Sequence, residues 1–346
     1  MNFKSDNTAT VCPEILEAIC EANHGHSASY SNDDYTKRLQ KQVDEIFEIQ
    51  TSIFFTNTGT AANSLALSAL VPSYGSIFCH SEAHIQVDEC NGPEFFTHGA
   101  KLLTIEGDNG KISPDELVTK IEFHRSMRPH MTNPYALSLT QATECGTVYY
   151  PDKIKELTNI AKTYDLSVHM DGARFANAVI TLGMSPADMT WRSGVDVLCF
   201  GGTKNGALMA EMIIFFNQKY TLDFDYRIKR SGQLMSKGRF LAAQFLTLFE
   251  DNLWLKNANH ANQMAKRLEE TLRKIPGVFI VNPVEANEVF AFIPAATAGA
   301  LYDKGATFYA WGPVDQNIYR FVTSWITDPK EIAELESIVT TFLTST

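Results

Sequence analysis

Short apolar runs alternate with stretches of helical periodicity between residues 52 and 216 of this 346-residue chain. The runs that predict strands lie at 52–55, 76–79, 100–105, 166–170, 195–200 and 212–216, and predicted helices include 61–70 and one that begins at Pro151. Strand–helix–strand order is typical of parallel strands joined by right-handed crossovers. We therefore predict an α/β fold with a large domain, in which helices flank a mostly parallel central sheet.

The pattern changes toward the C-terminus. Long helices are predicted at 240–255 and 257–275, and strand-like runs follow at 278–281, 289–292 and 319–322 before a closing helix from about Pro329 to Phe342. A chain of 346 residues is long for one hydrophobic core. We expect a large domain at 1–240, which includes the N-terminal segment, and a smaller α+β domain at 241–346.

Charge and cysteine usage narrow the classes of partner. The formal net charge of −11 repels nucleic-acid phosphates and anionic membranes, although a local basic patch can still hold one small anion. The six cysteines form no CxxC pair, so we expect reduced thiols and no bound metal. No apolar leader and no run of about 20 apolar residues is present. We expect a cytoplasmic protein that acts on a small molecule, with no nucleic-acid or membrane partner.

Three loops that follow predicted strands collect the residues with chemical potential. Ligands of open α/β sheets bind beyond the carboxyl ends of the strands. In the first loop, residues 57–63, the small residues Thr58, Gly59 and Thr60 leave backbone N–H groups accessible at the start of a helix. Such a loop can cradle a phosphate, and it is equally typical of a plain helix N-cap.

The second and third loops carry Asp171 and Lys204. An aspartate that ends an apolar strand needs a cationic partner, and the protonated pyridine nitrogen of pyridoxal phosphate (PLP) is one; capping of the next helix is the alternative. Lys204 lies among glycines past another strand, where a partly desolvated amine suits Schiff-base formation. A phosphate-binding lysine is disfavoured because GxxxxGK[ST] is absent, and a solvated surface lysine remains an alternative.

The separation of Asp171 from Lys204 leaves room for one strand–helix–strand crossover. The two side chains are therefore expected at the ends of neighbouring strands, within reach of opposite ends of one aromatic ring.

Six motifs in order along the chain resemble those of the threonine aldolases. They are SDNTA (5–9), TNTGTAAN (56–63), EAHIQVDE (82–89), HMDGARFANA (169–178), FGGTKNGAL (200–208) and YRFVTSW (319–325). The resemblance implies a PLP enzyme with the aspartate aminotransferase fold, in the β-eliminating lyase group. Two departures, Thr203-Lys204 in place of Ser-Lys and 140–144 in place of Glu-Asn-Thr-His, resemble a branch that includes phenylserine aldolases.

The resemblance also implies a role for individual residues. Lys204 would form the Schiff base, Asp171 would pair with the pyridine nitrogen and His84 would stack on the ring. The implied catalytic residues are Lys204, His84, Asp88 and Asp171. The implied cofactor-binding residues are Thr58, Gly59, Thr60, His84, Thr143, Asp171, Arg174, Thr203, Lys204, Lys229 and Arg230. The implied substrate-binding residues are Ser5, Asp6, Tyr30, Arg174 and Arg320.

Tyr30, Lys229 and Arg230 fall where members of the family place residues that reach a neighbouring subunit's site. The resemblance thus implies a homo-oligomer, a dimer of dimers, with shared active sites. A solvated basic run is the alternative for Lys229 and Arg230.

The expected activity is cleavage of β-hydroxy-α-amino acids, such as L-threonine, L-allo-threonine or β-phenylserine, to glycine and an aldehyde. His84 is the expected base for the β-hydroxyl proton, alone or through a water held with Asp88. Alternatives are β-elimination or racemisation on the same scaffold. An NAD-dependent dehydrogenase is more remote because no GxGxxG turn is present, and a non-catalytic binding module would not need both Lys204 and Asp171.

Overall fold

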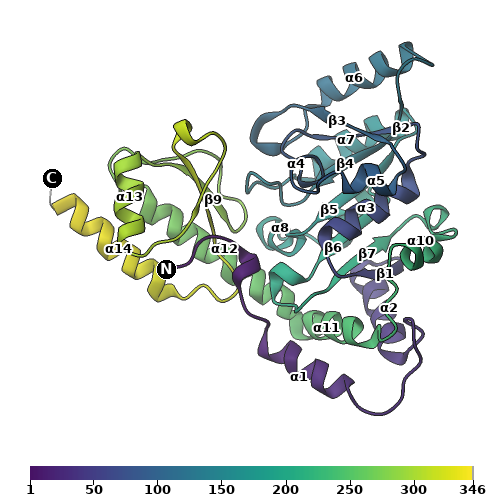
Figure 1. The fold of residues 1–346 in the computed structure, drawn as a ribbon, viewed down its shortest axis with the longest axis horizontal. Helices are drawn as coiled ribbons and strands as arrows, with labels where there is room; N and C mark the ends of the chain where they lie inside the picture. Colours follow the sequence, from purple (N-terminus) through teal and green to yellow (C-terminus); the bar gives the residue numbers. More distant parts are fainter. Residues whose placement is uncertain (345–346) are drawn as a thin grey trace.

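The computed structural model describes residues 1–344, which form a large lobe built on one sheet and a smaller lobe beside it (Figure 1). The strands of the large sheet are β1 (Ser52–Thr56), β2 (Gly75–His80), β3 (Lys101–Ile105), β4 (Asn133–Thr140), β5 (Ser167–Gly172), β6 (Val197–Gly201) and β7 (Glu211–Phe215). Their order is β1-β7-β6-β5-β4-β2-β3.

The large sheet is mostly parallel, as the sequence predicted. Strands β6, β5, β4, β2 and β3 pair in parallel, whereas β7 is antiparallel to both β6 and β1. Since β1 and β6 flank the reversed strand, they run in the same direction as each other. Six strands therefore end at one edge of the sheet, and β7 begins there.

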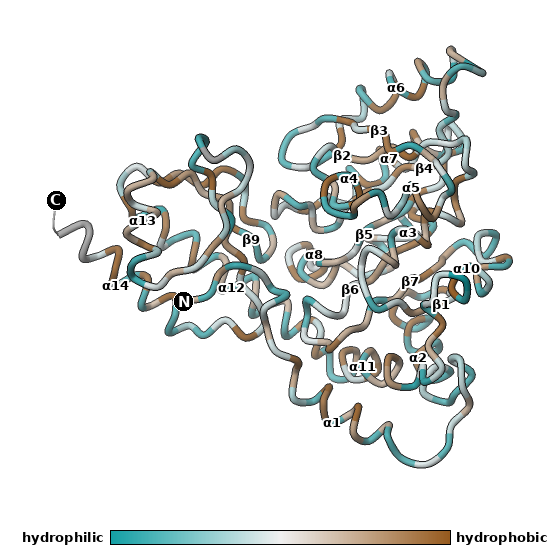
Figure 2. Tube along the Cα trace, viewed as in Figure 1, coloured by the Kyte–Doolittle hydropathy of each residue, from teal (hydrophilic) through white to brown (hydrophobic). Residues whose placement is uncertain are grey.

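Helices cover both faces of the sheet. The helices of the large lobe are α1 (Pro13–Ala22), α2 (Asp34–Phe47), α3 (Gly59–Leu70), α4 (His84–Val87), α5 (Gly92–Phe96), α6 (Pro114–Ser126), α7 (Pro151–Thr163), α8 (Phe175–Leu182), α9 (Pro186–Met189), α10 (Phe224–Arg230) and α11 (Arg239–Phe249). Side chains of β6 alternate between the faces: Leu198 and Phe200 pack toward α11, and Val197 and Cys199 pack toward α3. Hydrophobic stretches are visible along α11 and around β2 and β4 (Figure 2).

The smaller lobe has its own apolar core. Four antiparallel strands, β8 (Phe279–Ile280), β9 (Glu288–Phe292), β10 (Tyr309–Ala310) and β11 (Ile318–Val322), pack with α12 (Leu253–Leu272), α13 (Ala295–Asp303) and α14 (Pro329–Thr344). Phe3 is fully buried in this core, so the N-terminal segment crosses from the smaller lobe to α1 (Figure 1). Helix α12 contributes to both cores. The division at residue 240 remains a prediction about independent units.

The junction between the two long helices lies earlier than predicted. Helix α11 ends at Phe249 and α12 begins at Leu253, instead of a break at residue 256. Asp251 and Asn252 adopt left-handed φ angles of 47° and 56°. Aspartate and asparagine tolerate that region better than most residues, which explains why the chain turns here.

Among the helices of residues 1–344, none has the length and apolar character needed to cross a bilayer.

Candidate active site

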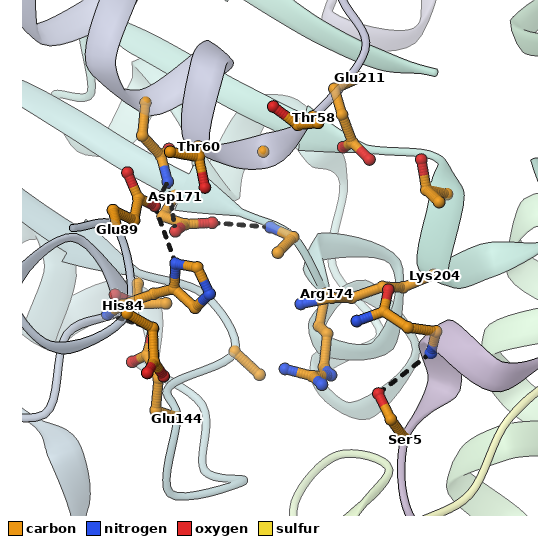
Figure 3. Close-up of a pocket in the computed structure, with 18 of the residues that line it drawn as sticks. Ser5, Thr58, Thr60, His84, Glu89, Glu144, Asp171, Arg174, Lys204 and Glu211 are labelled. Atoms are coloured by element: carbon orange, nitrogen blue, oxygen red, sulfur yellow. Dashed lines mark hydrogen bonds and ion pairs between the residues drawn. The ribbon is translucent and has the colours of Figure 1, made fainter. Parts of the chain in front are cut away.

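A cavity of about 360 Å³ opens where the strands of the large sheet end, a size suited to a small-molecule site. The loops after β1, β2, β4, β5 and β6, the start of β7, the N-terminal segment and the small lobe all contribute to its wall. The predicted site residues that line it are Ser5, Thr58, Gly59, Thr60, His84, Asp88, Asp171, Arg174, Thr203, Lys204 and Arg320. Residues far apart in sequence therefore meet in one cavity (Figure 3).

Asp171 and Lys204 lie at the ends of neighbouring strands, as their spacing predicted. Strands β5 and β6 pair in parallel, and Lys204 follows β6 in a short 3-10 turn, Thr203–Asn205. A Cβ atom on Gly201 would come within 2.6 Å of the Ala173 carbonyl oxygen, so glycine is needed where the two loops touch.

The Asp171 carboxylate is buried and ready to receive a cation. It accepts hydrogen bonds from Asn63 Nδ2 at 2.8 Å and from the Ala173 backbone N–H at 2.9 Å, and only 4% of the residue is exposed. Among residues 1–344 no cationic side chain forms an ion pair with it. A buried carboxylate without a cation is costly, and the protonated pyridine nitrogen expected from the sequence would supply one. The site therefore fits that cofactor.

The N-terminus of α3 fits the phosphate of the same cofactor. Thr58 caps the helix, since its hydroxyl accepts a hydrogen bond from the Ala61 N–H at 3.2 Å. A Cβ atom on Gly59 would meet nothing within 4 Å, so the cavity is open at this point. The partial positive charge of the helix N-terminus favours an anion there. The N-cap and phosphate interpretations are therefore compatible.

His84 is oriented by a buried glutamate. Its Nδ1 lies 2.8 Å from Glu89 Oε1, which also accepts a hydrogen bond from Asn63 Nδ2 at 2.9 Å. The bond to Glu89 raises the pKa of His84, although burial lowers it. The other ring nitrogen faces the middle of the cavity (Figure 3). Asp88 lines the cavity from an exposed position. The residue that forms the hydrogen bond with the His84 ring is Glu89, which follows Asp88 in the chain.

Alternating charges form a chain from the N-terminal segment to the small lobe. Asp6 accepts hydrogen bonds from Arg174 Nε at 2.8 Å and Nη2 at 3.1 Å, and Arg174 Nη1 lies 3.3 Å from Glu288 Oε2. Arg320 Nη1 lies 3.8 Å from Glu288 Oε1, and its guanidinium covers the ring of Trp311 at 4.6 Å. Asp6 is 2% exposed and faces Arg174, so it holds that side chain in place.

Five predicted residues lie outside the cavity wall: Asp6, described above, and four others. Thr143 is buried behind it, within 2.9 Å of the Thr147 hydroxyl. Tyr30, Lys229 and Arg230 are exposed on another part of the surface, where Lys229 Nζ lies 5.2 Å from the Tyr30 ring centroid. The cavity of one chain therefore does not include them.

Several cavity residues were not predicted as site residues from sequence. They are Asn7, Asn57, Asn63, Glu89, Thr140, Ala142, Glu144, Ala173, Glu211, Glu288 and Trp311. Glu144 accepts a hydrogen bond from the His84 backbone N–H at 2.9 Å, and burial raises its pKa to about 8. Asn63 is the last residue of the motif at 56–63, and Glu89 is the last residue of the motif at 82–89. Their places in these motifs could have identified them as site residues. Glu211 and Glu288 lie in strands that carried no motif.

Comparisons with known proteins agree with this geometry. A sequence model of the beta-eliminating lyase family matches residues 2–296. The chain is 46% identical over 333 residues to a low specificity L-threonine aldolase of Pseudomonas sp., covering 96% of this chain and 95% of the relative. It is 26% identical to an alanine racemase of Cochliobolus carbonum over 89% of this chain and 79% of the relative. A solved threonine aldolase of Leishmania major superposes with a TM-score of 0.93 at 26% identity, over 99% of both chains.

Proposed function

The chain belongs to the beta-eliminating lyase family of PLP-dependent enzymes, and from this premise we propose that it cleaves β-hydroxy-α-amino acids to glycine and an aldehyde. L-threonine, L-allo-threonine and β-phenylserine are the proposed substrates. The observation that carries the proposal is the meeting of Asp171, Lys204 and Arg320 in one cavity, where a cofactor and an amino-acid carboxylate can be held together.

The chain's own residues have distinct tasks around the cofactor. Lys204 would attach it, Asp171 would hold its pyridine nitrogen protonated, and the start of α3 would hold its phosphate. When bound, PLP withdraws electrons from a bond at the substrate Cα. Arg320 would fix the substrate carboxylate, which decides the bond that is aligned for cleavage.

His84 is the proposed base that removes the β-hydroxyl proton. The hydrogen bond to Glu89 fixes the ring and leaves the opposite nitrogen free toward the cavity. Asp88 could hold a water on the exposed side of His84, which keeps the water-mediated route within the proposal. Glu144, joined to the His84 backbone, adds a second carboxyl group that can carry a proton near neutral pH.

Replacement of His84 with asparagine is expected to lower kcat about 10²–10⁴-fold, the usual contribution of a positioned acid–base group. Cofactor content should fall much less than kcat, because Lys204, Asp171 and the start of α3 are untouched and only the proposed stacking of His84 on the ring is lost. Absorbance of the bound cofactor and steady-state kinetics measure the two effects separately. His130→Asn, at an exposed position away from the cavity, is the matched control. An unchanged kcat and pH profile would remove His84 from the mechanism.

Replacement of Arg320 with alanine is expected to raise KM about 10–100-fold and to leave the cofactor spectrum unchanged. Arg320 Nε is buried, and within the described part of the chain it has no hydrogen-bond partner, so it is available to a carboxylate. A charge-assisted hydrogen bond contributes roughly 1.5–3 kcal/mol, which sets this range.

Arg320→Lys should restore only part of the affinity, because an ammonium cannot form the two-pronged contact of a guanidinium. Arg192→Ala, which removes exposed ion pairs to Glu48 and Asp188, is the control. Equal KM values for wild type and Arg320→Ala would mean that Arg320 does not bind the substrate carboxylate and has only a structural ion pair with Glu288.

Product analysis tests the proposed reaction directly. Each of the three substrates should release glycine and its matching aldehyde in equal amounts. Release of ammonia and a keto acid would mean β-elimination. The similarity to an alanine racemase supports racemisation as a second candidate, and interconversion of L- and D-alanine without glycine release would favour it.

We also propose that the enzyme is a cytoplasmic homo-oligomer with shared sites. Tyr30 is 46% exposed next to Lys229, outside its own chain's cavity, which suits contact with another subunit. Leu208 and Met209, just after the Lys204 turn, are 47% and 52% exposed and offer an apolar surface for such contact. The proposed cytoplasmic location is supported by six cysteines that form no disulfide among the described residues.

A further inference from the structure

Glu211 occupies an unusual position at the phosphate end of the cavity. It is the first residue of β7, paired with Thr56 of β1 on one side and Gly201 of β6 on the other. Because β7 runs opposite to both neighbours, its first residue lies at the edge where they end. Glu211 therefore stands between the loop that enters α3 and the turn that carries Lys204 (Figure 3).

The surroundings of Glu211 contain little positive charge. Glu211 is 8% exposed. The charged or titratable groups that act on its carboxyl group are Lys204, Asp171 and the Cys199 thiol. Strand β1 and helix α3 contribute no charged residue. Burial raises the pKa of Glu211 to about 7, although hydrogen bonds from Thr203 and the charge of Lys204 lower it.

An ionised carboxylate at this position would oppose a phosphate. A phosphate monoester carries a charge of about −1.5 to −2 at neutral pH. Two acidic groups that share one site, here a carboxyl group and a phosphate, cannot both stay ionised without a large cost in free energy. Among residues 1–344, no cationic side chain forms an ion pair with Glu211 that would offset the repulsion.

We infer that Glu211 faces the phosphate site as a neutral carboxylic acid, so that the cavity takes up a proton when a phosphorylated ligand binds above neutral pH. The inference rests on the proposed function, because it takes the α3 end of the cavity as the phosphate site. Its consequence is that the affinity for the cofactor falls as pH rises. Glutamine at this position should remove that dependence, since it keeps the side chain's size and its ability to donate a hydrogen bond.

Calorimetric titration of cofactor-free protein with pyridoxine 5′-phosphate tests the inference. This probe has an alcohol in place of the aldehyde, so its binding does not depend on attachment to Lys204. From pH 6 to pH 8, a group with a pKa near 7 changes from about nine-tenths to about one-tenth protonated. The affinity of wild type for pyridoxine 5′-phosphate should therefore fall about tenfold more over this range than the affinity of Glu211→Gln. At pH 8, binding of the probe to wild type should be accompanied by the uptake of close to one proton more than binding to the variant.

Unphosphorylated pyridoxine separates this effect from protonation of the pyridine nitrogen near Asp171. At pH 8, binding of pyridoxine 5′-phosphate to wild type should be accompanied by the uptake of more protons than binding of pyridoxine. This comparison uses wild type alone, so it does not need the variant to fold. Equal proton uptake for both probes, or equal pH dependence in wild type and Glu211→Gln, would overturn the role of Glu211. If pyridoxine 5′-phosphate bound neither protein at either pH, this result would also contradict the proposal that the cavity binds PLP.

Discussion

Replacement of Lys204 with alanine is expected to abolish turnover and covalent retention of PLP. Lys204 is the lysine that lines the cavity, and it follows β6 beside the buried Asp171 loop. Its amine would attach the cofactor and, once displaced by the substrate amine, deliver a proton to Cα after the aldehyde has left. Loss of the acid–base role alone costs about 10²–10⁴-fold, and loss of attachment adds to it. Activity and the absorbance of bound PLP, measured on the same sample, check both effects.

The matched control is Lys266→Ala, on α12 of the small lobe, where the exposed ammonium lies 3.7 Å from the half-buried Glu269. An ion pair made by an exposed lysine contributes little to stability, so this variant should keep activity and cofactor content. Substantial turnover by Lys204→Ala, with PLP still covalently held, would refute the assignment of Lys204.

Replacement of Asp171 with asparagine is expected to lower turnover about 10²-fold or more, with some cofactor still bound. The neutral amide cannot keep the pyridine nitrogen protonated, and a charge pair worth several kcal/mol corresponds to this loss of rate. The amide also has only one oxygen for the two N–H donors of Asn63 and Ala173 that Asp171 accepts. Single-turnover kinetics on samples saturated with PLP would separate the rate from occupancy.

Asn63→Ala is the informative comparison for Asp171. It removes one donor to the carboxylate but leaves the charge, so its effect on rate should be much smaller than that of Asp171→Asn. Thermal unfolding of the cofactor-free proteins adds a second test, because removal of a buried carboxylate that has no cation should not lower stability greatly. Near wild-type turnover by Asp171→Asn would exclude the proposed pairing.

The fold was largely predictable because its periodicity is local. Alternation of apolar runs and helical stretches predicted the mostly parallel sheet, which the pairing of β6, β5, β4, β2 and β3 confirms. The sequence did not predict β4, whose apolar residues are interrupted by Tyr135 and Ser138. The break before α12 depends on the backbone angles of Asp251 and Asn252, which periodicity does not reveal.

The centre of the site was also predictable, since parallel strands end at one edge and bring their following loops together. The spacing of Asp171 and Lys204 predicted neighbouring strands, and the pairing of β5 with β6 confirms it. The supporting acids were not predictable in the same way. Glu211 reaches the cavity only because β7 is antiparallel, so that its first residue lies where its neighbours end. Strand direction is set by the whole sheet and not by local sequence.

Asp6 has structural contacts that the sequence did not reveal. The resemblance placed it beside the substrate. In the structure it is buried, both carboxylate oxygens accept hydrogen bonds from Arg174, and Oδ2 also accepts one from Asn287. That contact joins the N-terminal segment to residues about 170 and 280 positions away. A direct contact of Asp6 with substrate remains a proposal, whereas its hold on Arg174 is part of the structure.

Borohydride reduction of the PLP-loaded enzyme, followed by peptide mapping, tests the central claim most directly. Reduction makes the bond between cofactor and lysine permanent, so the modified residue can be identified by mass spectrometry. We predict a single pyridoxyl phosphate adduct on the peptide that contains Lys204, and its absence from Lys204→Ala. An adduct on Lys229 or any other lysine in place of Lys204, or no adduct in a PLP-saturated sample, would contradict the account.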